Sequence, residues 1–232
     1  MVTSQYQHVW DCCCDHGLLG FALLSGLTNS KLHFVDIHFV DIVPKLMTKV
    51  EQKLEHFFPN SRWQTHCLDV AKLPLAQYQG KHLVIIAGVG GDLMMQFIEA
   101  IYQQHKNLTL DFLLCPVHHQ FSLRQKLIAL DFSLKDEVLI EDNQRFYEIM
   151  LVSSCSDGKS KINPVGDKIW QSTSSEQAEI VNKYLQKTLN HYQRILQGSR
   201  QNFAENKANN VQNIIDAYSA KLSTAAPCLD KQ

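Results

Sequence analysis

The sequence predicts an α/β protein with a doubly wound parallel sheet, followed by a helical hairpin. Short β-rich runs alternate with segments of helical period through residue 152, and this alternation is typical of parallel βαβ units. Two last β-rich runs, 132–140 and 146–153, are separated by a short polar turn. They predict an antiparallel hairpin at the end of the sheet.

Strands are expected ahead of this hairpin wherever β-rich residues end at an acid, a glycine or a proline. Their ranges are 9–11, 32–37, 63–68, 81–87 and 110–115. Helices are expected between them because apolar residues recur three and four positions apart. The helical ranges are 18–25, 42–58, 93–102 and 122–129. The run 81–87 is the most apolar and is expected at the centre of the sheet.

The chain is expected to contain two folded parts. Residues 1–153 form the α/β domain, and the polar residues 154–175 are expected to be a linker. Residues 176–222 carry two segments of heptad-like spacing that are joined at Gly198-Ser199, which predicts an antiparallel, coiled-coil-like helical hairpin. The tail 223–232 is expected to be disordered.

The composition is that of an ordinary globular protein, with 45% hydrophobic and 19% charged residues. The chain opens without the pattern of a signal peptide and has no apolar run of membrane-spanning length, so a cytoplasmic protein with reduced cysteines is expected. Acidic residues outnumber basic ones through residue 152, and the reverse holds from residue 153 onward. The basic part fits either a polyanionic partner or a solvated helical surface.

Acids and glycines are expected at the carboxyl ends of the first four strands, where open α/β sheets bind ligands. Asp11 precedes a turn of small residues, Asp36 ends the second run, Asp69 follows the third, and Gly88-Val89-Gly90-Gly91 follows the fourth. Each acid could instead be a helix cap or a turn residue. Together they predict a cofactor pocket.

A parallel sheet that ends in an antiparallel hairpin resembles the class I S-adenosylmethionine-dependent methyltransferases, which have a Rossmann-like fold. Such a sulfonium cofactor needs an acid for its ribose hydroxyls, an acceptor for its adenine amine and a partner for its ammonium group. These are expected to be Asp36, Asp69 and Asp11, in that order. The expected cofactor contacts are Asp11, Cys13, Gly17, Asp36, Ile37, Asp69, Val70, Ala87, Gly88, Val89 and Gly90.

Four motifs resemble those of the bacterial TrmK family of tRNA adenine-N1 methyltransferases. Residues 11–19 are similar to the family's Asp-Ile-Gly-Ser-Asp-His-Ala-Tyr-Leu, and residues 86–93 to its Ile-Ala-Gly-Met-Gly-Gly-Glu-Leu. Leu114-Cys115-Pro116 with Leu123-Arg124 is similar to a later motif, and Glu141-Asp142 with Phe146-Tyr147-Glu148-Ile149 to another. Cys13, Leu18 and Val117 depart from the family's glycine, tyrosine and asparagine.

This resemblance implies S-adenosylmethionine-dependent methylation of N1 of an adenine in tRNA, at position 22. Asp15 is then the candidate to stabilise positive charge on the base, and His16 the candidate to hold the base or orient Asp15. Capping of the following helix is the alternative role for both. The target base must leave the tRNA stack, because N1 is a pairing edge.

Further residues are candidates for contact with RNA. They are Pro116, His118 and Arg124 in the α/β domain, and Lys183, Lys187 and Arg194 on the helical hairpin. Arg124 could instead lie on the surface. The hairpin could instead be a solvated arm or a dimerisation arm, and a monomer or weak dimer is expected.

A metal site is not expected. Cys115, His118 and His119, with His66 and Cys67 as possible partners, match no common zinc spacing. The adjacent cysteines 12–14 are expected to be small packing residues. Two other functions stay open, namely methylation of another RNA site or substrate, and a cofactor-binding RNA module without transfer activity.

Overall fold

The structure is a computed structural model that describes residues 6–28, 35–156, 158–201 and 205–222. The chain divides into two compact units. The first contains Met1–Asp136 and Ile149–Lys161, and the second contains Glu137–Glu148 and Ile162–Gln232. No helix among the described residues is both long and apolar enough to cross a bilayer.

The sheet has the strand order β3-β2-β1-β4-β5-β7-β6. Strands β1 to β5 pair in parallel, and β7 pairs with β5 in the antiparallel direction. The predicted doubly wound sheet with a terminal antiparallel hairpin is therefore confirmed. The bounds are β1 His8–Cys12, β2 Asp36–Asp41, β3 Trp63–Cys67, β4 His82–Ala87, β5 Leu110–Cys115, β6 Ser133–Asp142 and β7 Arg145–Ser153.

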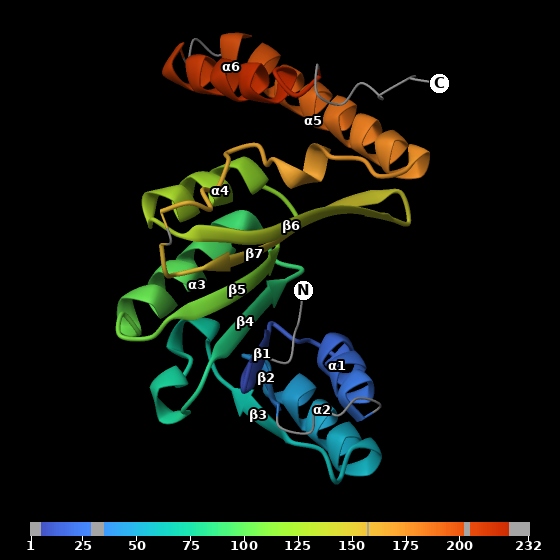
Figure 1. Cartoon of the computed structure of the whole chain (residues 1–232), viewed down its shortest axis with the longest axis vertical. Coiled ribbons are helices and arrows are strands. Elements are labelled where there is room, and N and C mark those ends of the chain that lie inside the picture. Colours follow the sequence, from blue (N-terminus) through green and yellow to red (C-terminus); the bar gives the residue numbers. More distant parts are fainter. Residues whose placement is uncertain (1–5, 29–34, 157, 202–204, 223–232) are drawn as a thin grey trace. The chain divides into compact units, whose positions relative to one another are not determined.

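Helices cover both faces of the sheet in the first unit, with α1 and α2 on one side and α3 on the other (Figure 1). A buried apolar cluster joins α1 and α2 to β1 and β2, and it includes Val9, Leu24, Phe39 and Leu54. The helical bounds are α1 Leu18–Thr28, α2 Pro44–Phe57, α3 Gly91–Gln104 and α4 Gln120–Ala129, with short 3-10 turns η1 at Val70–Lys72 and η2 at Leu75–Gln77.

The second unit is built around two helices, α5 (Ser175–Gln201) and α6 (Glu205–Ser219), which pack against each other. A 3-10 turn, η3 (Lys168–Trp170), supplies a buried Trp170. Its ring lies 5.8 Å from the Tyr184 ring and 6.1 Å from the Tyr218 ring, measured between centroids. Aromatic packing therefore ties the residues that precede the hairpin to both of its helices.

The second strand lies four residues later than the sequence predicts, and the acid that ends it lies five residues later. It runs from Asp36 to Asp41, so Asp36 begins the strand and Asp41 ends it. The prediction that Asp36 ends this strand is wrong. The cause is a pentapeptide, His-Phe-Val-Asp-Ile, that occurs twice in tandem at 33–37 and 38–42. Either copy reads as a strand that ends in an acid, and the fold uses the second.

One ion pair distinguishes the two copies. Arg62 Nε and Nη2 lie 2.5 and 2.8 Å from the two carboxylate oxygens of Asp36. A shift of β2 by five residues would place Lys31 where Asp36 now faces Arg62, and Leu32 where Ile37 is buried. The apolar positions within the strand would be filled equally well, whereas Ser30 would replace the buried Val35 and two cations would meet. The Asp36–Arg62 pair therefore favours the observed register.

Deletion of residues 33–37 is expected to leave a folded protein. The remaining copy can supply the same histidine, phenylalanine, valine and aspartate to the strand. Lys31 would then meet Arg62 and Ser30 would replace the buried Val35, at a cost of about 1–3 kcal/mol. Urea unfolding, monitored by circular dichroism, measures the change in the free energy of unfolding. Deletion of Leu83–Ala87 from β4 is the control and should abolish folding. An insoluble or unfolded 33–37 deletion would contradict the interchangeability of the two copies.

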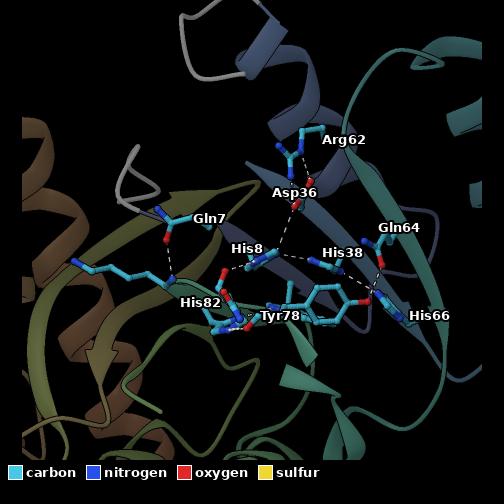
Figure 2. A network of polar contacts seen from close by, with 12 residues as sticks. Gln7, His8, Asp36, His38, Arg62, Gln64, His66, Tyr78 and His82 are labelled. Carbon is cyan, nitrogen blue, oxygen red and sulfur yellow. Dashed lines mark hydrogen bonds and ion pairs between the residues drawn. The ribbon is translucent and has the colours of Figure 1, made fainter. Parts of the chain in front are cut away.

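A row of histidines crosses one face of the sheet in the first unit (Figure 2). His8 Nδ1 lies 3.1 Å from His38 Nε2, and His38 Nδ1 lies 2.9 Å from His66 Nε2. His8 Nε2 lies 3.1 Å from the carbonyl oxygen of Gln79. Because a carbonyl only accepts, His8 donates from Nε2, His38 donates to His8, and His66 donates to His38. In this arrangement the Nδ1 atoms of His8 and His38 act as the acceptors.

Histidines also hold the segment 73–79 on this face. His82 Nε2 lies 3.2 Å from the carbonyl oxygen of Tyr78, and His105 Nε2 lies 2.8 Å from that of Leu73. With the bond from His8 to Gln79, imidazoles bind three main-chain carbonyls of one short segment. The segment begins directly after η1, which Asp69 precedes.

Candidate active site

The loop after β1 has an unusual main chain. Cys13, Asp15 and Gly17 have positive φ angles of 57°, 49° and 74°. The amide of Gly17 donates to the carbonyl of Cys14 at 2.7 Å, and the amide of Cys14 donates to Val40 at 3.1 Å. Alternation of left-handed residues turns amide groups to one side of a loop, which suits an anionic ligand. The turn thus accepts a side chain at Cys13, where the resembled family has glycine.

The Asp11 carboxylate is buried beneath this loop, with 4% of the residue exposed. It accepts a 2.9 Å hydrogen bond from the amide of Gly20. Burial raises the pKa of Asp11 from 3.8 to about 6, against the effect of the Gly20 bond. No basic side chain contributes to this shift. A cationic ligand group would therefore find a carboxylate with little solvation to lose.

The loops after β1, β2 and β3, together with Phe97 of α3, line a cavity of about 280 Å³ that is open to solvent. Asp41 accepts hydrogen bonds from the amides of Asp15 and Val43, both at 3.0 Å, and so joins two of these loops. Asp69 accepts from the amide of Ala71 at 2.9 Å, so it also caps η1. The lining residues are Cys13, Asp41, Ile42, Leu68, Asp69, Val70 and Phe97.

Two acids and several apolar side chains thus share one cavity, an arrangement that fits a nucleoside. Carboxylates accept hydrogen bonds from ribose hydroxyls, and apolar walls contact the faces of a base. The cysteines are not nucleophiles here. Burial, followed by the charge of Asp41, raises the pKa of Cys13 to about 11, and burial raises that of Cys14 to about 12. Neutral thiols at this turn agree with a packing role.

The glycine loop after β4 is joined to the loop after β5 by main-chain bonds. The amide of Gly88 donates to Cys115 at 3.2 Å, that of Val117 to Val89 at 3.0 Å, and that of Gly91 to His118 at 3.0 Å. Gly88 has a φ of 77°, which glycine adopts without strain. The two loops therefore form one rigid wall at the carboxyl edge of the sheet.

Replacement of Gly91 by alanine is expected to destabilise this wall. A Cβ at Gly91 would lie 2.8 Å from the His118 carbonyl oxygen and 3.0 Å from that of His119, and neither can move without breaking the loop. The expected loss is about 1–3 kcal/mol in the free energy of unfolding. Gly90→Ala is the matched control, because its Cβ would meet only the exposed His118 ring. Equal losses by urea unfolding would contradict this prediction.

Asp15 and His16 project from the β1 loop as a pair. His16 Nδ1 lies 2.8 Å from Asp15 Oδ1, and their side chains are 57% and 66% exposed. The amide of Asp15 is held by the Asp41 carboxylate, so the main chain beneath the pair is fixed. An exposed carboxylate on a fixed loop can meet a ligand without reorganisation.

Two predicted site residues lie away from this edge. Asp36 is at the amino end of β2 and binds Arg62, while Ile37 is buried in the apolar core with 1% exposed. Both positions follow from the five-residue error in β2, and Asp41 and Ile42 occupy the equivalent places. Arg124 is fully buried in α4, so neither the expected RNA contact nor the alternative surface position fits.

The remaining candidates keep their predicted neighbourhoods. Gly17, Val70, Ala87, Val89 and Gly90 lie at the carboxyl edge, and Pro116 and His118 lie on the adjoining loop. On α5 the side chains of Lys183, Lys187 and Arg194 are exposed. Lys183 Nζ lies 2.7 Å from Glu179, and Lys187 Nζ lies 5.1 Å from the centre of the Phe146 ring. Within the described ranges, no group of three potential ligands could hold a metal ion.

Sequence reasoning missed Asp41, Ile42, Phe97 and the contact between Asp92 and His119. The second copy of the pentapeptide carries the signal for the first two. Phe97 lies one and a half turns into α3, where it reads as an ordinary apolar position. The Asp92–His119 contact joins residues 27 positions apart and has no sequence signature.

The fold has several solved counterparts. The TrmK protein of M. capricolum, in complex with S-adenosyl-homocysteine, has 18% sequence identity to this chain and a TM-score of 0.64. The match covers 91% of this chain and 92% of the M. capricolum chain. The B. subtilis m1A22 tRNA methyltransferase TrmK has 17% sequence identity and a TM-score of 0.69. The match covers 94% of this chain and 92% of the B. subtilis chain. A putative tRNA (m1A22) methyltransferase of Streptococcus pneumoniae, in complex with S-adenosyl-L-methionine, has 16% sequence identity and a TM-score of 0.56. The match covers 94% of this chain and 92% of the S. pneumoniae chain.

No curated protein matches the sequence. The likeness to the solved structures shows a shared fold. The model of one protein family, described as "Methyltransferase domain", matches residues 1–150, which hold the sheet and all the loops of the candidate site. On this match the chain belongs to the methyltransferase domain family.

Proposed function

We propose that this protein transfers a methyl group from S-adenosylmethionine to N1 of an adenine in tRNA, at position 22. The observation that carries the proposal is the arrangement at the carboxyl edge of the sheet. A buried Asp11, two acids in one cavity, a glycine loop and an exposed Asp15–His16 pair all meet there. The TrmK structures with the same fold support the choice of substrate.

The residues present fit the cofactor. Asp41, rather than Asp36, would accept from the ribose hydroxyls, since it ends β2 and lines the cavity. Asp69 would accept from the adenine amine, with Ile42 and Val70 against the base. Asp11 would pair with the ammonium, because its carboxylate is buried without a basic partner contributing to its pKa. The cofactor supplies a methyl group on a positively charged sulfur.

Adenine N1 has an in-plane lone pair, so no proton needs to leave before transfer. The N1–carbon bond forms as the carbon–sulfur bond breaks, the sulfur keeps the electron pair, and positive charge moves to the base. The Asp15 carboxylate is the residue we assign to stabilise that charge, and His16 orients it through the 2.8 Å contact. Fixed positioning of the base can supply about 7–11 kcal/mol at best.

The second unit is proposed to bind tRNA through α5. Lys183, Lys187 and Arg194 expose their side chains on this helix, and basic side chains contact phosphates without regard to sequence. α5 and α6 would act as a coiled-coil-like arm of a cytoplasmic monomer or weak dimer. Lys187→Glu combined with Arg194→Glu should raise the Kd for tRNA at least about tenfold and leave cofactor affinity unchanged.

The direct test is a methyl-transfer assay with labelled S-adenosylmethionine and unmodified tRNA, followed by nucleoside analysis. N1-methyladenosine is the expected product. Another methylated nucleoside would favour a different RNA site. A protein that binds the cofactor without transfer to any RNA would favour a non-catalytic module.

Asp15→Ala is expected to lower kcat about 100- to 1000-fold while the Kd of the cofactor stays within about threefold. The loss follows from removal of one preorganised charge at the reacting base. Asp131→Ala, at an exposed acid after α4, is the control and should leave turnover unchanged. Normal turnover in Asp15→Ala would remove Asp15 from the mechanism.

A further inference from the structure

The imidazole of His118 lies directly over Gly90. A Cβ on Gly90 would come within 2.3 Å of His118 Cε1 and 2.7 Å of Nε2. The missing side chain of Gly90 therefore provides the space that the ring occupies. The main chain on both sides of His118 is fixed, because the amide of Val117 donates to Val89 and the carbonyl of His118 accepts from Gly91.

His119 holds the next position in a costly conformation. It has a φ of 63° and begins α4, in a left-handed geometry that costs a non-glycine residue about 1 kcal/mol. Its Nδ1 lies 2.9 Å from Asp92 Oδ2 in the first turn of α3. The ring of His119 contacts that of His118 edge to face, with centroids 4.4 Å apart and an interplanar angle of 65°.

These contacts form a continuous series from Asp92 through His119 and His118 to Gly90. The exposed ring of His118 is thereby held against the glycine loop, which is part of the proposed cofactor site. Asparagine or glycine would adopt the left-handed conformation at position 119 with less strain.

We propose that His118 accepts a hydrogen bond from the exocyclic amine of the target adenine, and that the Asp92–His119 pair positions its ring for that bond. This inference rests on the proposed function. The amine at C6 neighbours N1 on the same edge of the base. As the methyl carbon bonds to N1, positive charge spreads to the amine and makes its hydrogens stronger donors. A neutral imidazole acceptor then binds the transition state more tightly than the substrate.

The bond would also select the base. Adenine offers an amine at C6, whereas hypoxanthine and guanine offer a carbonyl, which cannot donate. His118 is the residue that contacts substrate in this scheme, and Asp92 and His119 are positioning residues. No proton is transferred to His118 in the step. Only a hydrogen bond is strengthened.

The test combines a change of residue with a change of base. In tRNA transcripts, the target adenosine is replaced by purine riboside, which keeps N1 and lacks the amine. For the wild-type protein this replacement should lower kcat about ten- to hundredfold. His118→Leu should lower kcat on normal tRNA by a similar factor, with the Kd for tRNA and for cofactor each within about twofold. In His118→Leu the purine replacement should cost about tenfold less than in the wild-type protein, because the bond is already absent and only the lower nucleophilicity of N1 in purine riboside remains.

The positioning role is tested by His119→Ala and His119→Asn. His119→Ala should lower kcat about tenfold with KM for tRNA unchanged. His119→Asn should restore only part of this loss, because asparagine tolerates φ of 63° and can still donate to Asp92 but has no ring to contact His118. His56→Ala, on the exposed end of α2, is the control.

The outcomes separate this inference from the proposed function. If wild-type protein transfers no methyl group to tRNA, the proposed function fails and this inference fails with it. If wild-type protein is active and the effects of His118→Leu and purine riboside multiply, the proposed function stands and the bond from His118 is refuted.

Discussion

Replacement of Asp11 by asparagine is expected to make the free protein more stable while weakening cofactor binding about 10- to 100-fold. The buried carboxylate has its pKa raised from 3.8 to about 6, so its charged form costs up to about 3 kcal/mol of folding free energy at pH 7.5. An asparagine oxygen can still accept from the amide of Gly20. The net gain should be about 1–3 kcal/mol in urea unfolding.

The loss of affinity has the same origin as the gain of stability. A carboxylate with little solvation forms a strong charge-assisted bond with an ammonium group, and such bonds contribute about 1.5–3 kcal/mol. Calorimetry with S-adenosylhomocysteine measures this on the free protein. Asp131→Asn is the matched control at an exposed acid and should change neither quantity. Unchanged affinity in Asp11→Asn would mean that the carboxylate does not bind the ligand.

The pH dependence provides an independent check on Asp11. The folded protein binds a proton at this carboxyl below about pH 6, whereas the unfolded chain does so only near pH 3.8. The stability gain of Asp11→Asn should therefore be complete above pH 6 and vanish as the pH falls toward 3.8. Cofactor affinity of the wild-type protein should fall about tenfold per unit below pH 6, and that of the variant should not.

The sequence predicts most of the fold because hydrophobic period and turn residues agree along the first unit. In the second unit the turn predicted at Gly198-Ser199 is wrong, because α5 continues through these residues to Gln201. In the first unit the exception is β2, where two identical pentapeptides satisfy the local rules equally. The choice between them depends on Asp36 meeting Arg62, which is a contact between strands and has no local signature. A pattern of apolar residues cannot resolve a register when the pattern itself repeats.

The candidate site was predictable where function depends on position along a strand. Asp11 is the penultimate residue of β1, Asp69 lies two residues after β3, and the glycine loop follows β4, so their place at the carboxyl edge follows from the βαβ pattern. Arg124 was not predictable in this way, because an arginine between two buried leucine positions of a helix ordinarily reaches the surface. His119 was not predictable either, because its left-handed conformation arises from the pairing of two loops.

Acid is expected to destabilise the first unit through its histidines. Burial is the largest cause that lowers the pKa of His38 from 6.5 to about 2 and that of His82 to about 4, and burial also lowers the pKa of His66. In the unfolded chain these rings take up protons near pH 6.5, whereas in the folded protein His38 and His82 stay neutral. Stability is therefore complete above pH 6.5 and falls as the pH decreases from 6.5 toward 4.

The expected size of this loss follows from His38 and His82, set against the opposite effect of Asp11. Each histidine removes about 2 kcal/mol at pH 5, and protonation of Asp11 returns about 1.4 kcal/mol. The wild-type protein should thus lose about 2–3 kcal/mol through these groups between pH 7.5 and 5. His38→Asn should reduce the slope of stability against pH by about 1.4 kcal/mol per unit between pH 6.5 and 5. His56→Asn, at an exposed histidine, should not.

The geometry of the network specifies where acid acts first. A proton on His38 Nδ1 would face the donor of His66, and a proton on His82 Nδ1 would face the indole of Trp10, which donates to that nitrogen at 3.2 Å. Loss of these bonds frees the rings that hold segment 73–79. Hydrogen exchange at pH 5 should therefore rise in that segment before it rises in α2, which packs on the other face. If the slope of stability against pH is unchanged in His38→Asn, the role of the histidine row is refuted. If His38→Asn does not fold, His82→Gln takes its place, and an unchanged slope there has the same meaning.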